Sequence, residues 1–282
     1  MLHHQELLIP SAFGRAMAAD LTYAVGSRIL AVYAHGINGF KDWGGMDLIA
    51  NEFASQGIAF LKFNFSHNGT TPDDPLSFVD LEAYGQDNYS IRQSDLKSVF
   101  NLVHSGGLPL DINVVVLIGH SRGGVDATIY ACQHDHLDAL ITWSAPSEAN
   151  TPWSSWDEER LAEWKEQGVT YLVNGRTKQK MPLYYQLFKD VESNANRYDI
   201  LERTKDLQIP WLIVHGDADE AVSTQHARKL ARSTKYAQVQ LVPKTGHTFD
   251  RTHPWEQPSL PNASIELCEH SIRFILDSVR SS

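Results

Sequence analysis

Two kinds of hydrophobic segment alternate along the chain. Short apolar runs, typical of strands buried on both faces of a parallel sheet, occupy residues 28–34, 58–65, 114–118, 139–143, 211–215 and 238–242. Apolar residues at helical spacing, or helix-forming residues, occupy residues 46–55, 89–104, 125–132, 224–232 and 265–279. Residues 5–25 predict two short strands joined at Phe13-Gly14-Arg15 as an edge hairpin. This order predicts an α/β fold, with a mostly parallel sheet of about eight strands and helices on both faces.

Residues 147–205 break the alternation and form a predicted insert between two parts of the core, residues 1–146 and 206–282. Within the insert, residues 156–167 predict an acidic amphipathic helix. Residues 169–173 and 176–181 predict a hairpin around Asn174-Gly175, a pair that favours a type I′ turn.

Composition narrows the class of protein. The 282 residues are 42% hydrophobic and 21% charged, which is ordinary for a globular protein, and the net charge of −10 argues against nucleic acid or an anionic membrane as partner. No apolar run approaches the roughly 18 residues of a membrane span, and the first residues lack the pattern of a signal peptide. Only Cys132 and Cys268 are present, which fits a reducing compartment. We therefore expect a cytoplasmic enzyme or binding protein.

The apolar run at residues 114–118 leads directly into Gly119-His120-Ser121-Arg122-Gly123. This G-x-S-x-G pattern between a buried strand and a helix is typical of a nucleophile elbow. The chain turns so sharply there that its middle residue is strained and its neighbours must be small. The alternative is a glycine turn with an incidental serine.

Carboxylates and a histidine follow two later strands. Residues 211–215 are followed by Asp217 and Asp219, and residues 238–242 are followed by His247. Because the carboxyl ends of parallel strands meet at one edge of a sheet, these groups are expected near the serine. A serine hydroxyl needs a base to take its proton and an acid to orient that base, and either aspartate could be that acid.

Four motifs together resemble the α/β-hydrolase fold over nearly the whole chain: His35-Gly36, GHSRGG at residues 119–124, HGDADEAV at residues 215–222 and Gly246-His247. The resemblance implies a Ser121–His247–Asp219 triad, in which the family's spacing selects Asp219 over Asp217. It implies an oxyanion hole formed by the backbone N–H groups of Ile37 and Arg122. It also implies that residues 147–205 are a cap. The chain is more weakly similar to the serine-aminopeptidase-like and cinnamoyl-esterase branches.

The sequence departs from its relatives in two places. Arg122 stands where glutamine or methionine is common, and we expect its side chain to pair with Asp126, four residues on along the helix; attraction of an anionic substrate group is the alternative. The loop of residues 66–71 also differs from the usual G-x-G-x-S pattern.

The insert is rich in aromatic residues, which either line an apolar acyl pocket or hold the insert to the core. The predicted pocket residues are Trp153, Trp156, Tyr184 and Tyr185. No metal site is expected, since His134-Asp135-His136 lacks a further histidine and the acidic residues at 217–220 lack calcium-loop spacing.

We therefore expect a serine hydrolase that cleaves small-molecule carboxylic esters through an acyl-enzyme and needs no cofactor. The same triad would serve a peptidase, thioesterase, acyltransferase or C–C hydrolase. A binding protein that retains the fold is the remaining alternative.

Overall fold

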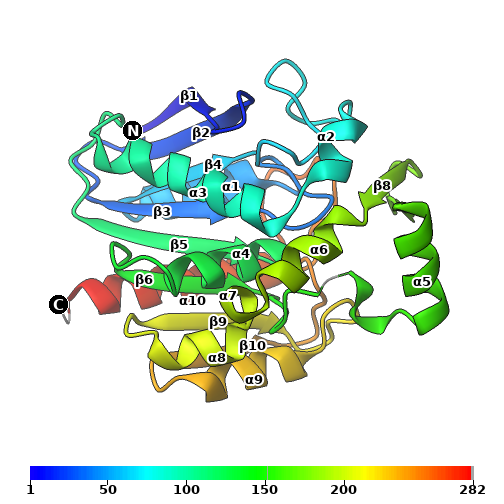
Figure 1. Cartoon of the computed structure of the whole chain (residues 1–282). Helices are drawn as coiled ribbons and strands as arrows, with labels where there is room; N and C mark the ends of the chain where they lie inside the picture. The colour runs from blue at the N-terminus through cyan, green and yellow to red at the C-terminus, as the bar shows by residue number, and fades with distance from the viewer. Residues whose placement is uncertain (151, 281–282) are drawn as a thin grey trace.

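Eight strands form one sheet in the computed structural model, which describes residues 1–150 and 152–280 (Figure 1). The sheet order is β1-β2-β4-β3-β5-β6-β9-β10. The strands are β1 (Leu2–Pro10), β2 (Ala16–Ala24), β3 (Ile29–Ala34), β4 (Ile58–Phe63), β5 (Val114–His120), β6 (Ala139–Trp143), β9 (Trp211–Gly216) and β10 (Ala237–Val242). β1 and β2 pair antiparallel, as do β2 and β4, and every other pair in the sheet is parallel. The predicted fold class is confirmed.

Helices cover both faces of this sheet. α1 (Met46–Ser55) and α10 (Asn262–Arg280) pack on one face, while α3 (Tyr89–His104), α4 (Arg122–Ala131) and α9 (Thr224–Ser233) pack on the other (Figure 1). Because successive side chains of a strand point to opposite faces, Leu30 belongs to the buried cluster under α3 and α4. Its neighbour Ala31 belongs to the cluster under α1 and α10.

The insert contains more helix than the sequence predicted. Its elements are η1 (Trp153–Ser155), α5 (Glu158–Gln167), β7 (Val169–Val173), β8 (Lys180–Tyr184), α6 (Gln186–Ser193), α7 (Ala195–Tyr198), α8 (Ile200–Arg203) and η2 (Thr204–Asp206). α5 begins where the Asp157 side chain accepts a hydrogen bond from the Arg160 N–H at 2.9 Å. It ends at Gly168, whose φ of 73° suits a residue without a Cβ.

The predicted hairpin is present as β7 and β8, but the predicted type I′ turn is wrong. The strands are joined by a six-residue loop, closed by a hydrogen bond from the Asn174 N–H to the Gln179 carbonyl at 2.9 Å. The Asn174 side chain accepts hydrogen bonds from the N–H groups of Arg176 and Thr177, and the positive φ falls at Lys178 instead of at the Asn-Gly pair. The side-chain bonds of Asn174 therefore favour a wider loop.

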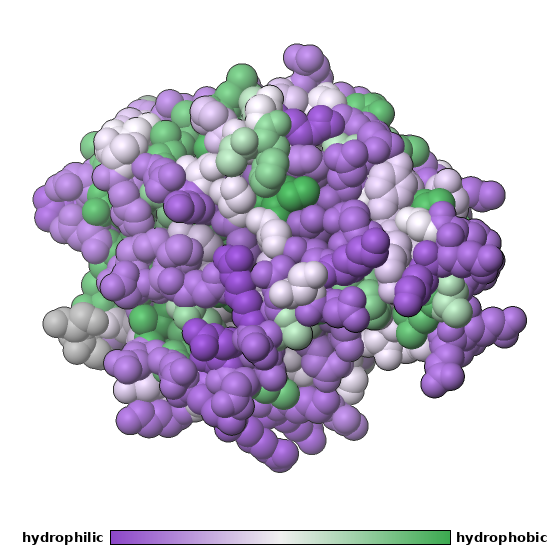
Figure 2. Space-filling model, viewed as in Figure 1, coloured by the Kyte–Doolittle hydropathy of each residue, from purple (hydrophilic) through white to green (hydrophobic). Residues whose placement is uncertain are grey.

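A further short helix, α2 (Leu81–Gln86), follows the loop after β4 and was not predicted. The Asp80 side chain begins it by accepting a hydrogen bond from the Ala83 N–H at 2.9 Å. On the face shown in Figure 2, hydrophilic residues predominate and hydrophobic residues are scattered among them. Within the described ranges, every helix is too short or too polar to cross a bilayer.

Candidate active site

Ser121 lies at the sharp turn between β5 and α4. Its φ of 54° and ψ of −125° place it in a strained region for a non-glycine residue, and its N–H donates to the Trp143 carbonyl at 2.9 Å. A Cβ on Gly119 would collide with the Gly123 carbonyl, and one on Gly36 would lie 2.9 Å from the Ser121 Cβ. The glycines are therefore required by close backbone packing around the serine.

His247 follows β10 and faces the carboxylate that follows β9. The His247 Nδ1 lies 2.8 Å from the Asp219 Oδ2. The Asp219 side chain has no solvent exposure, and its other oxygen accepts hydrogen bonds from the N–H groups of Ala221 and Val222, both at 2.9 Å. Asp217 is exposed and accepts from the Lys244 N–H at 2.6 Å instead. The geometry thus pairs His247 with Asp219 and turns Asp217 away.

A second histidine, which the sequence reasoning missed, touches the same carboxylate. The His215 Nε2 lies 2.8 Å from the Val222 carbonyl and 3.3 Å from the Asp219 Oδ2. Since a carbonyl only accepts, this nitrogen carries the proton. Burial alone would raise the pKa of Asp219, but the hydrogen bonds from His215 and His247 outweigh it and hold the pKa far below its usual range. The signal in the sequence that could have identified His215 was its position at the end of an otherwise apolar strand.

The loop after β3 contains Ile37, and His35 forms hydrogen bonds that hold this loop. Burial, with a contribution from the nearby Arg92 guanidinium, lowers the pKa of His35 to about 3, so its ring is neutral at pH 7. Its Nδ1 lies 2.9 Å from the Gly36 carbonyl, and its Nε2 accepts from the Phe65 N–H at 3.3 Å. The Gly36 carbonyl shares a planar peptide unit with the Ile37 N–H, so His35 orients that N–H.

The Arg122 side chain does not pair with Asp126, so that prediction is wrong. The Arg122 Nη1 donates to the Asp87 Oδ2 at 3.0 Å, and Asp126 instead accepts from the Arg92 Nε at 2.7 Å. Arg122 also lies over the Tyr89 ring, 4.8 Å from its centroid. Its side chain is only 2% exposed, which also argues against the alternative of contact with a substrate anion.

Ser121, His247 and Ile37 line one cavity of about 380 Å³. Its wall is largely apolar, with Trp43 and Val222 among the lining residues, which suits part of a small organic molecule. The loop between β7 and β8 forms another part of the wall through residues 174–176.

The four aromatic residues expected in the pocket lie elsewhere. Trp153, Trp156 and Tyr185 pack around the buried Trp164, with ring centroids 5.2–5.6 Å from it. The Trp164 Nε1 donates to the Leu183 carbonyl at 2.8 Å. These rings therefore pack on one another, and Trp153 and Trp164 also belong to the buried cluster of the core, which agrees with the alternative that the aromatic residues hold the insert to the core.

The fourth of these residues, Tyr184, joins the insert to α2. Its hydroxyl donates to the Glu82 Oε2 at 2.5 Å, and its ring lies so close to Gly85 that an added Cβ there would be 2.8 Å from the Tyr184 Cζ. The structure therefore brings none of the four to the cavity.

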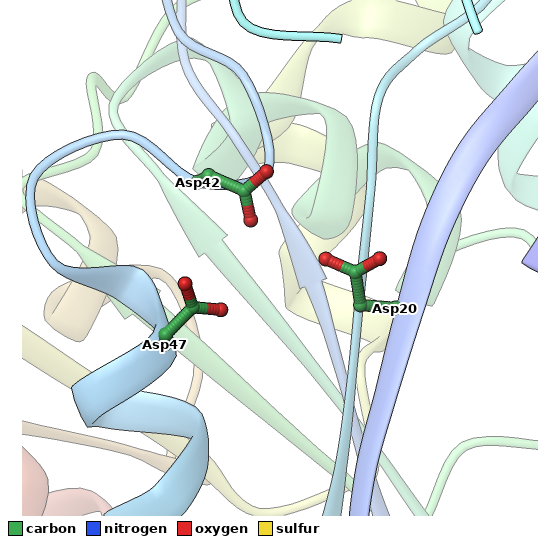
Figure 3. Close-up of side chains that lie close together, drawn as sticks. All are labelled: Asp20, Asp42 and Asp47. Atoms are coloured by element: carbon green, nitrogen blue, oxygen red, sulfur yellow. The ribbon is translucent and has the colours of Figure 1, made fainter. Parts of the chain in front are cut away.

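Three carboxylates outside this cavity resemble a cation site. Asp20, Asp42 and Asp47 have oxygens within 4.8 Å of one another, and their side chains point toward a common space (Figure 3). The buried Lys62 ammonium contacts all three carboxylates, at 2.8 Å for Asp20 and 2.6 Å for Asp47. Lys41 binds Asp20 at 2.5 Å and Asp42 at 2.6 Å. The cluster therefore carries its own counter-ions.

Comparisons with known proteins identify the family and the fold of the chain. The sequence pattern of the alpha/beta hydrolase family matches residues 31–259. Monoacylglycerol lipase ABHD6 from Rattus norvegicus is 22% identical over 253 residues, which cover 78% of this chain and 70% of that protein. Est1E from Butyrivibrio proteoclasticus superposes with a TM-score of 0.71 at 18% identity, covering 98% of this chain and 99% of that one. Alpha/beta hydrolase domain-containing protein 10 from mouse gives a TM-score of 0.70, with the same identity and coverage. These two structures share the fold.

Proposed function

Because this chain belongs to the alpha/beta hydrolase family, we propose that it is a carboxylesterase that cleaves small-molecule esters with Ser121 as nucleophile. The observation that carries the proposal is the 2.8 Å hydrogen bond between His247 Nδ1 and Asp219 Oδ2, at a cavity that Ser121 also lines. The name of the monoacylglycerol lipase described above indicates that this relative acts on an ester. This supports an ester, over other acyl compounds, as the substrate of this chain.

His247 acts as the base in this proposal. With Nδ1 donating to Asp219, its Nε2 is the acceptor that takes the Ser121 proton as Oγ attacks the ester carbonyl. The carbonyl oxygen becomes an oxyanion, and His247 then gives its proton to the leaving alcohol. Water attacks the resulting acyl-enzyme with His247 again as base, releasing the acid and restoring the serine. No cofactor takes part in these steps.

Two backbone N–H groups, those of Ile37 and Arg122, hold the oxyanion in this proposal. Arg122 directly follows the nucleophile at the start of α4, where helix N–H groups lack intrahelical acceptors. Ile37 lines the cavity, and His35 orients its peptide. Each such donor contributes roughly 3–4 kcal/mol to transition-state stabilisation in comparable enzymes.

Labelling with a fluorophosphonate probe tests the proposal. We expect the wild-type protein to be labelled and the Ser121→Ala variant to remain folded by circular dichroism but unlabelled. The matched control is Ser55→Ala, an exposed serine on α1, which should label like the wild type. Folded wild-type protein that stays unlabelled would contradict the proposal.

A panel of acyl esters, thioesters and aminoacyl amides then separates the possible reactions. Esters should be cleaved with the highest kcat/KM. A clear preference for thioesters or amides would keep the nucleophile but overturn the assignment as a carboxylesterase.

A further inference from the structure

Arg176 is the one permanently charged side chain along the active-site cavity, and no aspartate or glutamate lines it within the described residues. Two histidines of the wall, His120 and His35, do not add charge at neutral pH. Burial lowers the pKa of His120 to about 3, with a smaller contribution from His247, and the pKa of His35 is also about 3. Arg176 therefore supplies a positive charge to the cavity wall of a chain whose net charge is −10.

The contacts of Arg176 locate its charge on the Trp43 side of the cavity. The guanidinium carbon lies 5.9 Å from the centroid of the Phe40 ring. Phe40 meets His253 edge to face at 4.9 Å, and His253 stacks on Trp43, which lines the cavity. Burial and the charge of Arg176 both lower the pKa of His253, so that ring is not a competing cation.

The Arg176 charge has no counter-ion among the described residues. Asp42, a nearby acid that also acts on His253, has one oxygen bound by Lys41 at 2.6 Å and the other bound by Lys62. The guanidinium is therefore free to pair with an anion that enters the cavity.

The loop that carries Arg176 is anchored at both ends. Asn174 is 4% exposed, and its side chain accepts a hydrogen bond from the Arg176 N–H at 3.0 Å. At the other end of the loop, the Gln179 Nε2 donates to the Phe78 carbonyl at 3.0 Å. The backbone at Arg176 is therefore fixed, as recognition of a ligand by its side chain requires.

We propose that Arg176 selects esters that carry a second, ionised carboxylate, which its guanidinium binds while Ser121 attacks the ester. This inference rests on the proposed esterase function. Arginine suits the role because its planar fork of N–H donors matches a carboxylate in two parallel hydrogen bonds. The volume of about 380 Å³ is enough for a small bifunctional molecule.

Matched substrate pairs test this. The first places the carboxylate in the acyl group: 4-nitrophenyl hydrogen adipate against 4-nitrophenyl heptanoate. The second places it in the leaving alcohol: 4-acetoxybenzoate against its methyl ester. For at least one pair, we expect Arg176→Gln to lower kcat/KM about fivefold more for the carboxylate substrate than for its neutral partner, the size of a good partly exposed ion pair. The pair that responds shows which side of the ester faces Arg176.

The controls isolate the charge at this position. Arg176→Lys should retain part of the preference for the carboxylate substrate over its neutral partner. Lys180→Gln removes one exposed charge from the same hairpin and should retain all of this preference. Added salt should weaken the wild-type preference.

The outcomes distinguish a failure of the inference about Arg176 from a failure of the proposed esterase function. If the neutral esters are cleaved and Arg176→Gln changes both members of each pair equally, the inference about Arg176 is wrong and the esterase function stands. If the wild type cleaves none of these substrates, the function and the inference fall together.

Discussion

At the scale of single residues, two aspartates follow β9 two positions apart, but their surroundings differ completely. Asp219 is held by hydrogen bonds from two histidines and two backbone N–H groups, while Asp217 meets solvent and one N–H. An ionised, oriented carboxylate is what a catalytic histidine needs, because it stabilises the imidazolium that forms and keeps the correct tautomer. Only Asp219 has that environment.

Asp219→Asn should therefore lower kcat by about 10⁴, the loss seen when the acid of such a triad is replaced by its amide. Asp217→Asn should stay within about twofold of wild type, because the Asp217 side chain is exposed and accepts its hydrogen bond from the Lys244 N–H instead of from His247. Steady-state hydrolysis of the best ester of the panel measures both. Equal losses in the two variants would remove Asp219 from the mechanism.

At the scale of elements, α3 buries a polar face as well as an apolar one. Its apolar stripe includes Leu96 and Val99, but Arg92 and Asp95 are buried too. Arg92 pairs with Asp126 of α4 and donates to the His35 carbonyl at 2.7 Å. The polar face of α3 thus supports the loop that contains Ile37.

Asp95 makes this packing dependent on pH. Its Oδ2 accepts from the Ser66 N–H at 2.8 Å, and its Oδ1 has no hydrogen-bond partner among the described residues. Burial raises the pKa of Asp95 from 3.8 to about 7. The folded state therefore holds this proton more tightly than the unfolded chain does. The Asp95 carboxyl therefore contributes to the unfolding free energy below pH 4, and this contribution is lost as pH rises toward 7.

Asp95→Asn should remove the loss of stability that accompanies rising pH, since the amide oxygen keeps the hydrogen bond to Ser66 and the amide does not ionise. The drop in unfolding free energy between pH 5 and pH 8 should be about 2–3 kcal/mol smaller in the variant than in the wild type, at about 1.4 kcal/mol for each pKa unit. Urea unfolding at both pH values measures it. Asp111→Asn, at an exposed aspartate, should follow the wild-type profile, and a parallel profile for Asp95→Asn would disprove the role of Asp95.

At the scale of the whole molecule, the insert packs as a continuation of the core. Trp153, Trp164 and Leu187 of the insert belong to the same buried cluster as Leu30 and Val99 under the sheet. A segment that shares its buried apolar surface with the core gains little by unfolding alone, because it would expose that surface.

Unfolding should therefore occur in one transition that includes the insert. Trp164→Ala should lower the unfolding free energy by about 3–5 kcal/mol, the usual cost of removing a buried aromatic ring, while Tyr171→Ala at an exposed position should have little effect. Far-ultraviolet circular dichroism and tryptophan fluorescence, followed in urea, should give coincident curves. A separate early transition for the insert would contradict the shared core.

The sequence by itself determined the alternation of strands and helices, the strained turn at Ser121, and the positions of Asp219 and His247 after two strands. These features depend on local causes: hydrophobic periodicity, the small space around a tight turn, and the rule that parallel strands end at one edge of a sheet. The family spacing was needed to favour Asp219 over Asp217.

Tertiary structure alone decided which buried groups meet across elements. Arg122 pairs with Asp87, which lies at the end of another helix. Asp126 is not its partner, because Asp126 already pairs with Arg92 of α3. The aromatic rings of the insert pack on one another, and Arg176 reaches the cavity through a loop whose width Asn174 sets. Such contacts join residues far apart in the chain, and the hydrophobic periodicity of the sequence does not predict them. They follow only from how the elements pack.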